Sequence, residues 1–255
     1  MTSHRPHPAP AAPVLLLIAH GSRDPRHAAT VAALADRVRR LRPELRPATA
    51  YLDHCAPRVP QALATLAGRP AVAVPLLLNR AFHARHDIPA ALRAAGAALP
   101  VAEVLAPSPL LLEALDRRIA EALAPEVIPA DSRRGIGVVL AAAGSSDPAA
   151  DAATRALAAH WERTRGWGAV EVAYAAASGP RVADALAALR ARGLRRSVVA
   201  PYLLAPGVLP DRIATAAAEA GADLVAPVLG AAPELAALLL QRYGEVARPG
   251  TALAA

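Results

Sequence analysis

The sequence contains no lysine, one cysteine and few aromatic residues. Its 28 basic residues are therefore all arginines, aromatic residues make up 3% of the 255 positions, and Cys55 stands alone. A single cysteine excludes a disulfide framework and any zinc or iron–sulfur site built from several thiolates. The scarcity of aromatic side chains argues against single-stranded nucleic acid as a partner, because bases stack on such side chains.

Long hydrophobic runs are also missing. The longest are of strand length, as in residues 14–19, and are too short to span a bilayer. Residues 1–13 are rich in proline and histidine and have no apolar core of a signal peptide. We therefore expect a cytoplasmic protein with no membrane contact.

The formal net charge of +7 is the feature that most suggests nucleic-acid binding. The arginines, however, are spread along helix-like stretches instead of forming one basic run, so a solvated surface explains them better. A positive field of this kind also attracts a polyanionic small substrate. We expect no nucleic-acid partner.

The two halves of the chain repeat the same landmarks in the same order. An apolar run followed by Gly-Ser-x-Asp-Pro occupies residues 14–25 and again residues 136–148. Further runs correspond in the same way, 73–78 with 199–204 and 104–109 with 225–230. The repeat unit is far longer than a solenoid period, so the sequence predicts a duplicated lobe.

Strand-like and helix-like segments alternate in each half, which predicts an α/β fold with a small parallel sheet in each lobe. We expect strands near 14–19, 47–52, 70–78, 100–105, 136–142, 169–175, 196–204 and 222–227. We expect first-half helices near 24–41, 57–67, 86–97 and 108–123. The predicted organisation is a disordered tail (1–13), an N-terminal lobe with the metal site (14–124), a linker (125–135), a degenerate C-terminal lobe (136–243) and a tail (244–255).

Ionisable groups gather where the first-half strands end. His20 follows the first strand, Asp53 follows the second, and His83 and His86 come just beyond the third. Ligands of open parallel sheets bind at the carboxyl ends of the strands, so these side chains are predicted to meet. Two imidazoles and a carboxylate suit a divalent ion such as Fe²⁺, Co²⁺, Ni²⁺ or Zn²⁺.

The second half lacks these groups. Ala143 occupies the place of His20, and Leu209 stands roughly where His83 stands. The asymmetry favours a single metal site, although a lone histidine at a strand end is often only a hydrogen-bonded structural residue.

Plainer interpretations stay open for several positions. Asp53 can cap the turn that follows it, and His86 can be a first-turn helix residue or a support for another ligand. Gly21-Ser22 can serve only the tight turn into a helix, whose N-terminus still favours an anionic group. The motifs GxGxxG, GxxxxGK[ST] and GxSxG are absent, which removes the usual signatures of dinucleotide binding, P-loop chemistry and serine hydrolysis.

Three segments resemble the class II sirohydrochlorin chelatases, the ferrochelatase and cobaltochelatase family of sirohaem and cobalamin synthesis: 20–23 (His-Gly-Ser-Arg), 51–53 (Tyr-Leu-Asp) and 75–78 leading into 83–89 (His-Ala-Arg-His-Asp-Ile-Pro). With the duplication, the resemblance extends from Val14 to about Tyr243. It implies a lyase-type metal chelatase with one tetrapyrrole site in the cleft between two lobes. The family usually has glutamate where this chain has Asp53, whose side chain is one methylene shorter.

The resemblance also implies roles. His20 and His83 are expected to hold the metal, with Asp53 as a further ligand, and to act catalytically, since an imidazole can accept the protons that leave the pyrroles. Ser22, Arg23 and His86 are expected to bind sirohydrochlorin or a related polycarboxylate tetrapyrrole. Fe²⁺ or Co²⁺ would be a substrate, with no permanently bound cofactor.

Two other functions remain compatible with the sequence. One is a metal- or tetrapyrrole-binding carrier without insertion activity, and the other is a structural or regulatory α/β protein with incidental histidines. The family's longer members end in a cysteine-bearing iron–sulfur tail. The one cysteine of this sequence is Cys55 in the first half, so the chain is expected to have the plain two-lobed form. Because one chain already supplies a pseudo-symmetric pair of lobes, we expect a monomer.

Overall fold

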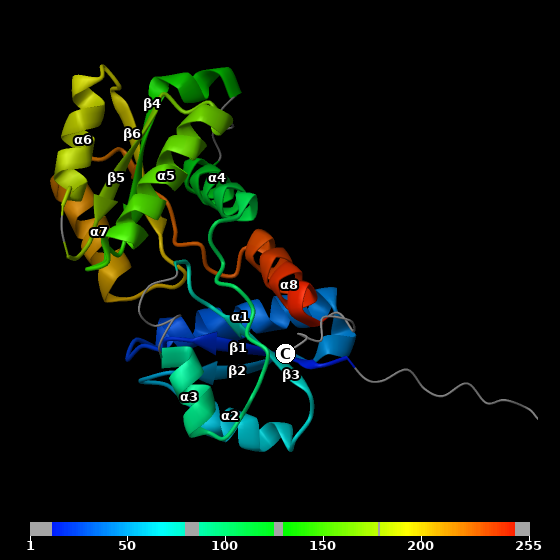
Figure 1. Ribbon diagram of the computed structural model, residues 1–255. Helices are drawn as coiled ribbons and strands as arrows, with labels where there is room; N and C mark the ends of the chain where they lie inside the picture. The colour runs from blue at the N-terminus through cyan, green and yellow to red at the C-terminus, as the bar shows by residue number, and fades with distance from the viewer. Residues whose placement is uncertain (1–11, 80–86, 125–129, 178, 248–255) are drawn as a thin grey trace, which may run out of the picture.

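The computed structural model describes residues 12–79, 87–124, 130–177 and 179–247 and shows an α/β protein with two parallel sheets flanked by helices (Figure 1). The strand order is β2-β1-β3 in the first sheet and β5-β4-β6-β7 in the second. The strands are β1 (Val14–Ala19), β2 (Ala48–Tyr51), β3 (Ala71–Pro75), β4 (Ile136–Ala142), β5 (Ala169–Tyr174), β6 (Arg196–Tyr202) and β7 (Leu224–Val225). The predicted two-lobed α/β architecture is confirmed.

Helices follow the strands in both halves. In the first half they are α1 (Pro25–Leu41), η1 (Pro43–Leu45), α2 (Val59–Leu66), α3 (Ile88–Ala94) and α4 (Pro109–Leu123). In the second they are η3 (Ala130–Gly135), α5 (Pro148–Arg165), α6 (Val182–Ala191), α7 (Val208–Glu219) and α8 (Pro233–Ala247). Of the predicted linker, residues 130–135 form η3, and residues 125–129 lie outside the described residues.

The repeated Gly-Ser-x-Asp-Pro segments explain why α1 and α5 begin where they do. The carboxylates of Asp24 and Asp147 each accept a hydrogen bond from the backbone N–H two residues later, at 2.9 Å in both cases. Proline occupies the first helical position of both helices, where its fixed φ suits the helix and its missing N–H costs nothing. The same local chemistry therefore starts the same element twice.

The loops that leave the strands are held by matching backbone hydrogen bonds. The Asp53 N–H donates to the His20 carbonyl at 2.7 Å, and the Ala176 N–H donates to the Ala143 carbonyl at 2.9 Å. Because the two sheets also share a parallel β-α-β pairing, with β1 and β4 central in each, the duplication read from the sequence is present in three dimensions.

The predicted strand at 100–105 is wrong. Val101 forms an isolated bridge with Ala73, and the following segment bonds to the loop after β3, as in the hydrogen bond from the Leu105 N–H to the Leu77 carbonyl, at 2.9 Å. Pro100 at the start of the segment and Pro107 just after it have no N–H to donate, which limits ladder pairing. Its counterpart β7 is likewise shorter than the predicted 222–227.

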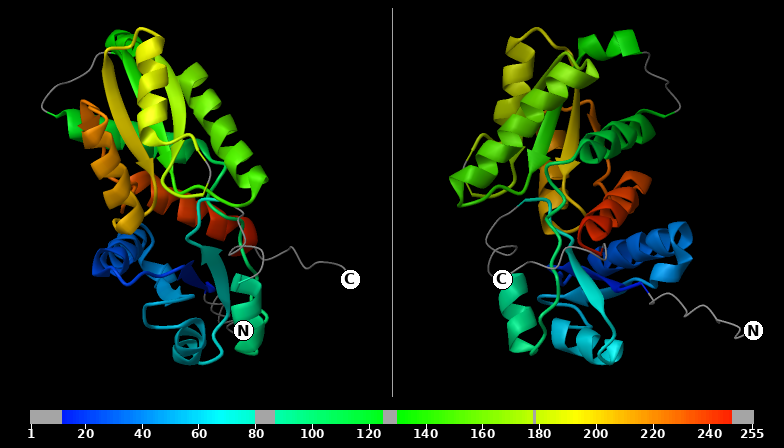
Figure 2. Two further views of the ribbon diagram at one scale, coloured as in Figure 1. Left: turned by 90° about the vertical axis from the view of Figure 1, so that its left-hand side faces the viewer. Right: turned by 45° about the vertical axis from the view of Figure 1, so that its right-hand side comes forward.

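The helices α4 and α8 pack across the division between the two halves. Helix α4 follows the first sheet in sequence but contacts β6 and β7, whereas α8, at the end of the second half, contacts α1 and β3. Both views in Figure 2 show α8, in red, between the two sheets. The predicted lobe boundaries, 14–124 and 136–243, stay a prediction. Helices α4 and α8 pack across these boundaries, and α8 continues beyond residue 243.

This exchange joins the two halves into one apolar layer. Buried side chains of β1, α1, α4, β4 and α8 form a single hydrophobic cluster, among them Leu17, Leu115, Leu140 and Leu238. The outer faces of the sheets have clusters of their own, with α2 and α3 on the first sheet and α6 and α7 on the second. None of the helices in the described part of the chain is long and apolar enough to cross a bilayer.

Candidate functional site

A cleft of about 820 Å³ lies where the strand ends of the two sheets face each other. The first sheet contributes His20 to Ser22 and Leu76 to Asn79, α1 contributes His27, and the second sheet contributes residues 142–147 and 202–210. The volume falls in the upper part of the range of small-molecule sites, roughly 300–1,000 Å³. One ligand can therefore contact both halves.

His20 reaches the cleft because β1 ends there and the chain turns at Gly21. Gly21 has a φ of +94°, and a Cβ on it would lie 1.7 Å from the Asp53 carbonyl oxygen. Only glycine fits this approach of two loops. The His20 ring lies edge-on to the His54 ring, with centroids 6.4 Å apart.

Asp53 adjoins His20 through the backbone, but its carboxylate is engaged elsewhere. It lies 2.9 Å from a guanidinium nitrogen of Arg58 and accepts the His54 N–H at 2.8 Å. That backbone hydrogen bond, and after it the Arg58 guanidinium, lowers the pKa of Asp53, so the carboxylate is ionised at neutral pH. Asp53 is not among the described residues that line the cleft.

His27 is a second cleft histidine that the sequence analysis missed. Its ring lies 6.3 Å from that of Tyr51, centroid to centroid, and its Nδ1 is buried with no hydrogen-bond partner among the described residues. Burial, followed by the charge of His20, lowers the pKa of His27 and keeps its imidazole neutral. The missed signal is position: a first-turn residue of the helix after a strand faces the end of that strand.

The predicted substrate-binding residues Ser22 and Arg23 are placed differently. Ser22 lines the cleft, but its hydroxyl also accepts the Asp24 N–H at 3.1 Å, and Ser145 does the same for Asp147 at the same distance. This repeated bond supports the interpretation of Ser22 as a turn residue. Arg23 is exposed and is not among the described lining residues.

His83 and His86 lie outside the described residues, so their predicted roles stay predictions. Among the residues described, no group of three or more histidine, cysteine, aspartate or glutamate side chains is arranged to hold a metal.

The second half presents the same scaffold without the imidazoles. Gly144 repeats the close approach of Gly21, since a Cβ on it would lie 2.3 Å from the Ala176 carbonyl oxygen. Ala143 and Leu209 line the cleft at the positions corresponding to His20 and, roughly, His83. The described imidazoles of the cleft, His20 and His27, both come from the first half.

The two halves are also linked at the cleft rim by charge. Arg26 in the first turn of α1 lies 2.6 Å from Asp211 in the first turn of α7 and 2.6 Å from Asp24. Because Arg26 and Asp211 are each about half exposed, water screens the pair and it contributes little to stability. It is a direct contact between the first turns of α1 and α7.

Comparison with known proteins gives one consistent result. The model of the CbiX family matches residues 14–122 and 137–246, which is both halves of the chain. A sirohydrochlorin ferrochelatase from Priestia megaterium is 29% identical over 205 residues, 78% of this chain and 76% of that protein. A sirohydrochlorin cobaltochelatase from the same organism is 27% identical over 222 residues, 78% of this chain and 66% of that protein.

A solved structure has the same fold. SirB from Bacillus subtilis, determined with Fe³⁺, superposes with a TM-score of 0.79 and covers 92% of this chain and 96% of its own, at 22% identity. At that identity the likeness is one of architecture.

Proposed function

The chain belongs to the CbiX family, and we propose that it is a sirohydrochlorin chelatase that inserts Fe²⁺ or Co²⁺ into its tetrapyrrole substrate. The observation that supports this most directly is the position of His20, at a strand end inside a cleft large enough for a macrocycle. The family match over both halves supplies the reaction class. The metal is a substrate in this proposal, and no permanent cofactor is needed.

His20 and His83 are the proposed metal-handling pair. A neutral imidazole is a good ligand for Fe²⁺ or Co²⁺, and the same group can accept a proton from a pyrrole N–H as the metal enters the ring. Two such protons leave for each metal inserted, so a pair of imidazoles matches the stoichiometry.

Asp53 is proposed as a third ligand. Its backbone is bonded to that of His20 at 2.7 Å, so the two residues are neighbours. Its carboxylate must exchange Arg58 for the metal, which adds a cost that a free carboxylate would not have. The Asp53 carboxylate stays paired with a positive charge when the divalent metal replaces the Arg58 guanidinium.

Ser22, Arg23 and His86 are proposed to bind carboxylates of the substrate. The described residues that line the cleft include no arginine. Arginines that pair with the substrate's carboxylates would therefore be exposed residues outside this lining. The proposal also includes a cytoplasmic location and a monomeric state, the second of which light scattering on the purified chain would test.

The experiment is an anaerobic absorbance time course of sirohydrochlorin with Fe²⁺ or Co²⁺, with and without the protein. We expect repeated turnover to the metallated product with the protein and a much slower change with metal alone. We expect His20→Ala to lose most of this acceleration, while His7→Ala, in the predicted tail, keeps it. Binding of one equivalent of metal or sirohydrochlorin per protein, without turnover, would instead identify a carrier.

A further inference from the structure

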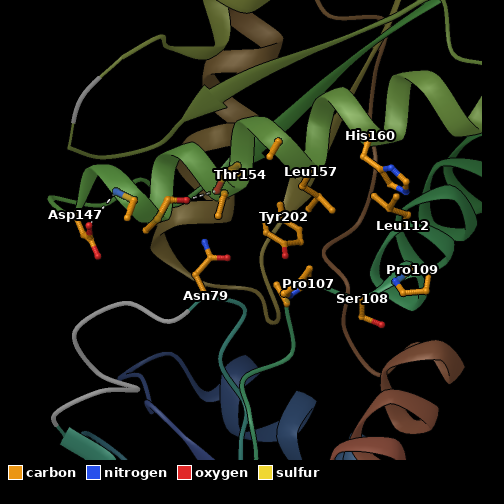
Figure 3. A pocket seen from close by; sticks show the side chains of 15 residues that line it. Asn79, Pro107, Ser108, Pro109, Leu112, Asp147, Thr154, Leu157, His160 and Tyr202 are labelled. Carbon is orange, nitrogen blue, oxygen red and sulfur yellow. Dashed lines mark hydrogen bonds between the residues drawn. The ribbon is translucent and has the colours of Figure 1, made fainter.

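A second cavity of about 820 Å³ opens beside the cleft and shares Asn79, Asp147, Ala150, Thr154 and Tyr202 with it. We call it the lateral cavity. Its walls are one face of α5 and the segment that leads into α4 (Figure 3), and most of its lining is small or apolar: Ala106, Pro107, Pro109, Leu112, Ala149, Ala153, Ala156 and Leu157. Because residues are shared, one ligand can occupy the cleft and the lateral cavity together.

A buried tyrosine hydroxyl lies at the lateral cavity. Tyr202 is 2% exposed, and its hydroxyl has no hydrogen-bond partner among the described residues. Figure 3 shows this hydroxyl pointing from β6 into the cavity, on the side where the Asn79 amide also points. An unsatisfied buried hydroxyl costs stability, so its presence needs a compensating role. Burial raises the pKa of Tyr202, which keeps the group protonated and able to donate.

The duplication supplies an internal comparison. The corresponding place in the first half is a cavity of only about 20 Å³, lined by His27, Thr30, Val31, Leu34, Leu76, Leu204, Ala205 and Gly230, with Ala19. The repeat aligns His27 with Ala150, Thr30 with Ala153 and Leu76 with Tyr202. On one scaffold, therefore, smaller side chains open the space in the second half, and a tyrosine places a donor where the first half has leucine.

We propose that the lateral cavity is part of the tetrapyrrole site and takes one edge of the macrocycle, with a carboxylate arm accepting hydrogen bonds from the Tyr202 hydroxyl and the Asn79 amide. This inference rests on the proposed function. The apolar wall of α5 suits the flat hydrocarbon edge of a ring, and two neutral donors suit a carboxylate. Asp147 is the acidic residue among the described lining residues, and Figure 3 places it at the end away from His160, with Tyr202 between them.

The first test is Tyr202→Phe, which removes only the hydroxyl. We expect the KM for sirohydrochlorin to rise about tenfold, as for loss of a hydrogen bond to a charged group, with kcat and the KM for metal unchanged. The dissociation constant of metal-free sirohydrochlorin, measured by absorbance titration without any metal, is expected to rise by the same factor. An unchanged KM in this variant overturns the inference.

The second test blocks the space. Ala153 and its neighbour Ala152 are both exposed on α5, but only Ala153 lines the lateral cavity. We expect Ala153→Phe to raise the KM for sirohydrochlorin and Ala152→Phe to leave it unchanged, at temperatures where both are folded. Equal effects of the two would count against the cavity as a binding site. Absence of metal insertion by the unaltered protein contradicts the proposed function, whereas normal insertion with unaffected variants contradicts this inference alone.

Discussion

Asp116 in α4 accepts a hydrogen bond from the indole nitrogen of Trp161 in α5, with the two atoms 2.9 Å apart. The same carboxylate oxygen accepts the indole N–H of Trp167 at 3.1 Å. The carboxylate thus ties a helix of the first half to two buried tryptophans of the second. This polar contact complements the apolar packing of α4 on the second sheet.

Removal of this carboxylate is expected to weaken the fold. Asp116→Ala leaves two buried indole donors without an acceptor, so we expect the free energy of unfolding to fall by about 2 kcal/mol or more. Urea denaturation followed by tryptophan fluorescence measures it. Glu113→Ala on the same helix is the control, because Glu113 is exposed and 3.5 Å from Arg165, and its loss is expected to cost below about 1 kcal/mol. Equal losses would show that the indole bonds contribute nothing.

The pH dependence of stability provides a separate test of Asp116. Burial is the largest influence on its pKa and raises it above the ordinary 3.8. Folding therefore favours the protonated form, and the contribution of this group to stability falls as pH rises from about 3.8 through the folded-state pKa. We expect Asp116→Asn, which keeps an acceptor oxygen, to lose this component, so that its stability relative to the wild type improves as pH rises. A constant difference would contradict the raised pKa.

His27 is expected to act on stability in the opposite sense. Its pKa is lowered from 6.5, first by burial and then by His20, so the folded state favours the neutral form. The stability that this provides is present above the unfolded-state pKa and is lost as pH falls through the folded-state value. We expect unfolding free energies between about pH 5 and 7.5 to fall less steeply with acidification for His27→Gln than for the wild type. Parallel curves would count against the burial of this imidazole.

The turn at Gly21 is expected to tolerate no side chain. Gly21→Ala forces a Cβ to within 1.7 Å of a carbonyl oxygen at a φ of +94°, and we expect a loss of at least about 2 kcal/mol in thermal or urea unfolding. Gly144→Ala, with a Cβ position 2.3 Å from Ala176, is expected to behave similarly. Gly244→Ala inside α8 meets nothing within 4 Å and is expected to stabilise by about 0.5–1 kcal/mol. A neutral Gly21→Ala would show that the two loops can separate.

Asp53 offers a test of metal ligation by side-chain length. Asp53→Asn is expected to raise the KM for Fe²⁺ or Co²⁺ about tenfold, because it removes an ionised ligand. Asp53→Glu, the residue usual in the family, is expected to keep the KM at or below the wild-type value, because the longer side chain reaches the metal with less displacement of Arg58. Asp36→Asn, on the exposed face of α1, is the control. If Asp53→Asn has no effect on metal saturation, Asp53 is a loop residue held by Arg58.

The sequence was most informative where local chemistry decides the structure. The Asp-Pro pairs at residues 24–25 and 147–148 mark the starts of α1 and α5, and continuous apolar runs mark β1 and β4. The failed strand at 100–105 shows the limit. Its apolar pattern was suitable, but pairing depends on how closely the segment follows β3, and Val101 alone achieves it.

The residues of the candidate site also differ in whether the sequence or only the packing reveals them. His20 could be found from its place at the end of a strand, and it does line the cleft. The position of His27 in the first turn after that strand was a signal for it as well, but only packing brings its ring beside Tyr51. The lateral cavity was equally hidden, since it requires α5 and the start of α4 to lie side by side.

By itself, then, the sequence determined the duplication, the α/β class, the strand-end position of His20 and the family, because each of these depends on residue order and spacing along the chain. The tertiary structure decided the crossing of α4 and α8 between the halves, the pairing of Asp53 with Arg58 and the burial of the Tyr202 hydroxyl away from any partner in the described part of the chain. These depend on which surfaces meet when two similar lobes pack. Contacts of this kind join residues far apart in the sequence, so local sequence preference does not reveal which sheet each helix covers.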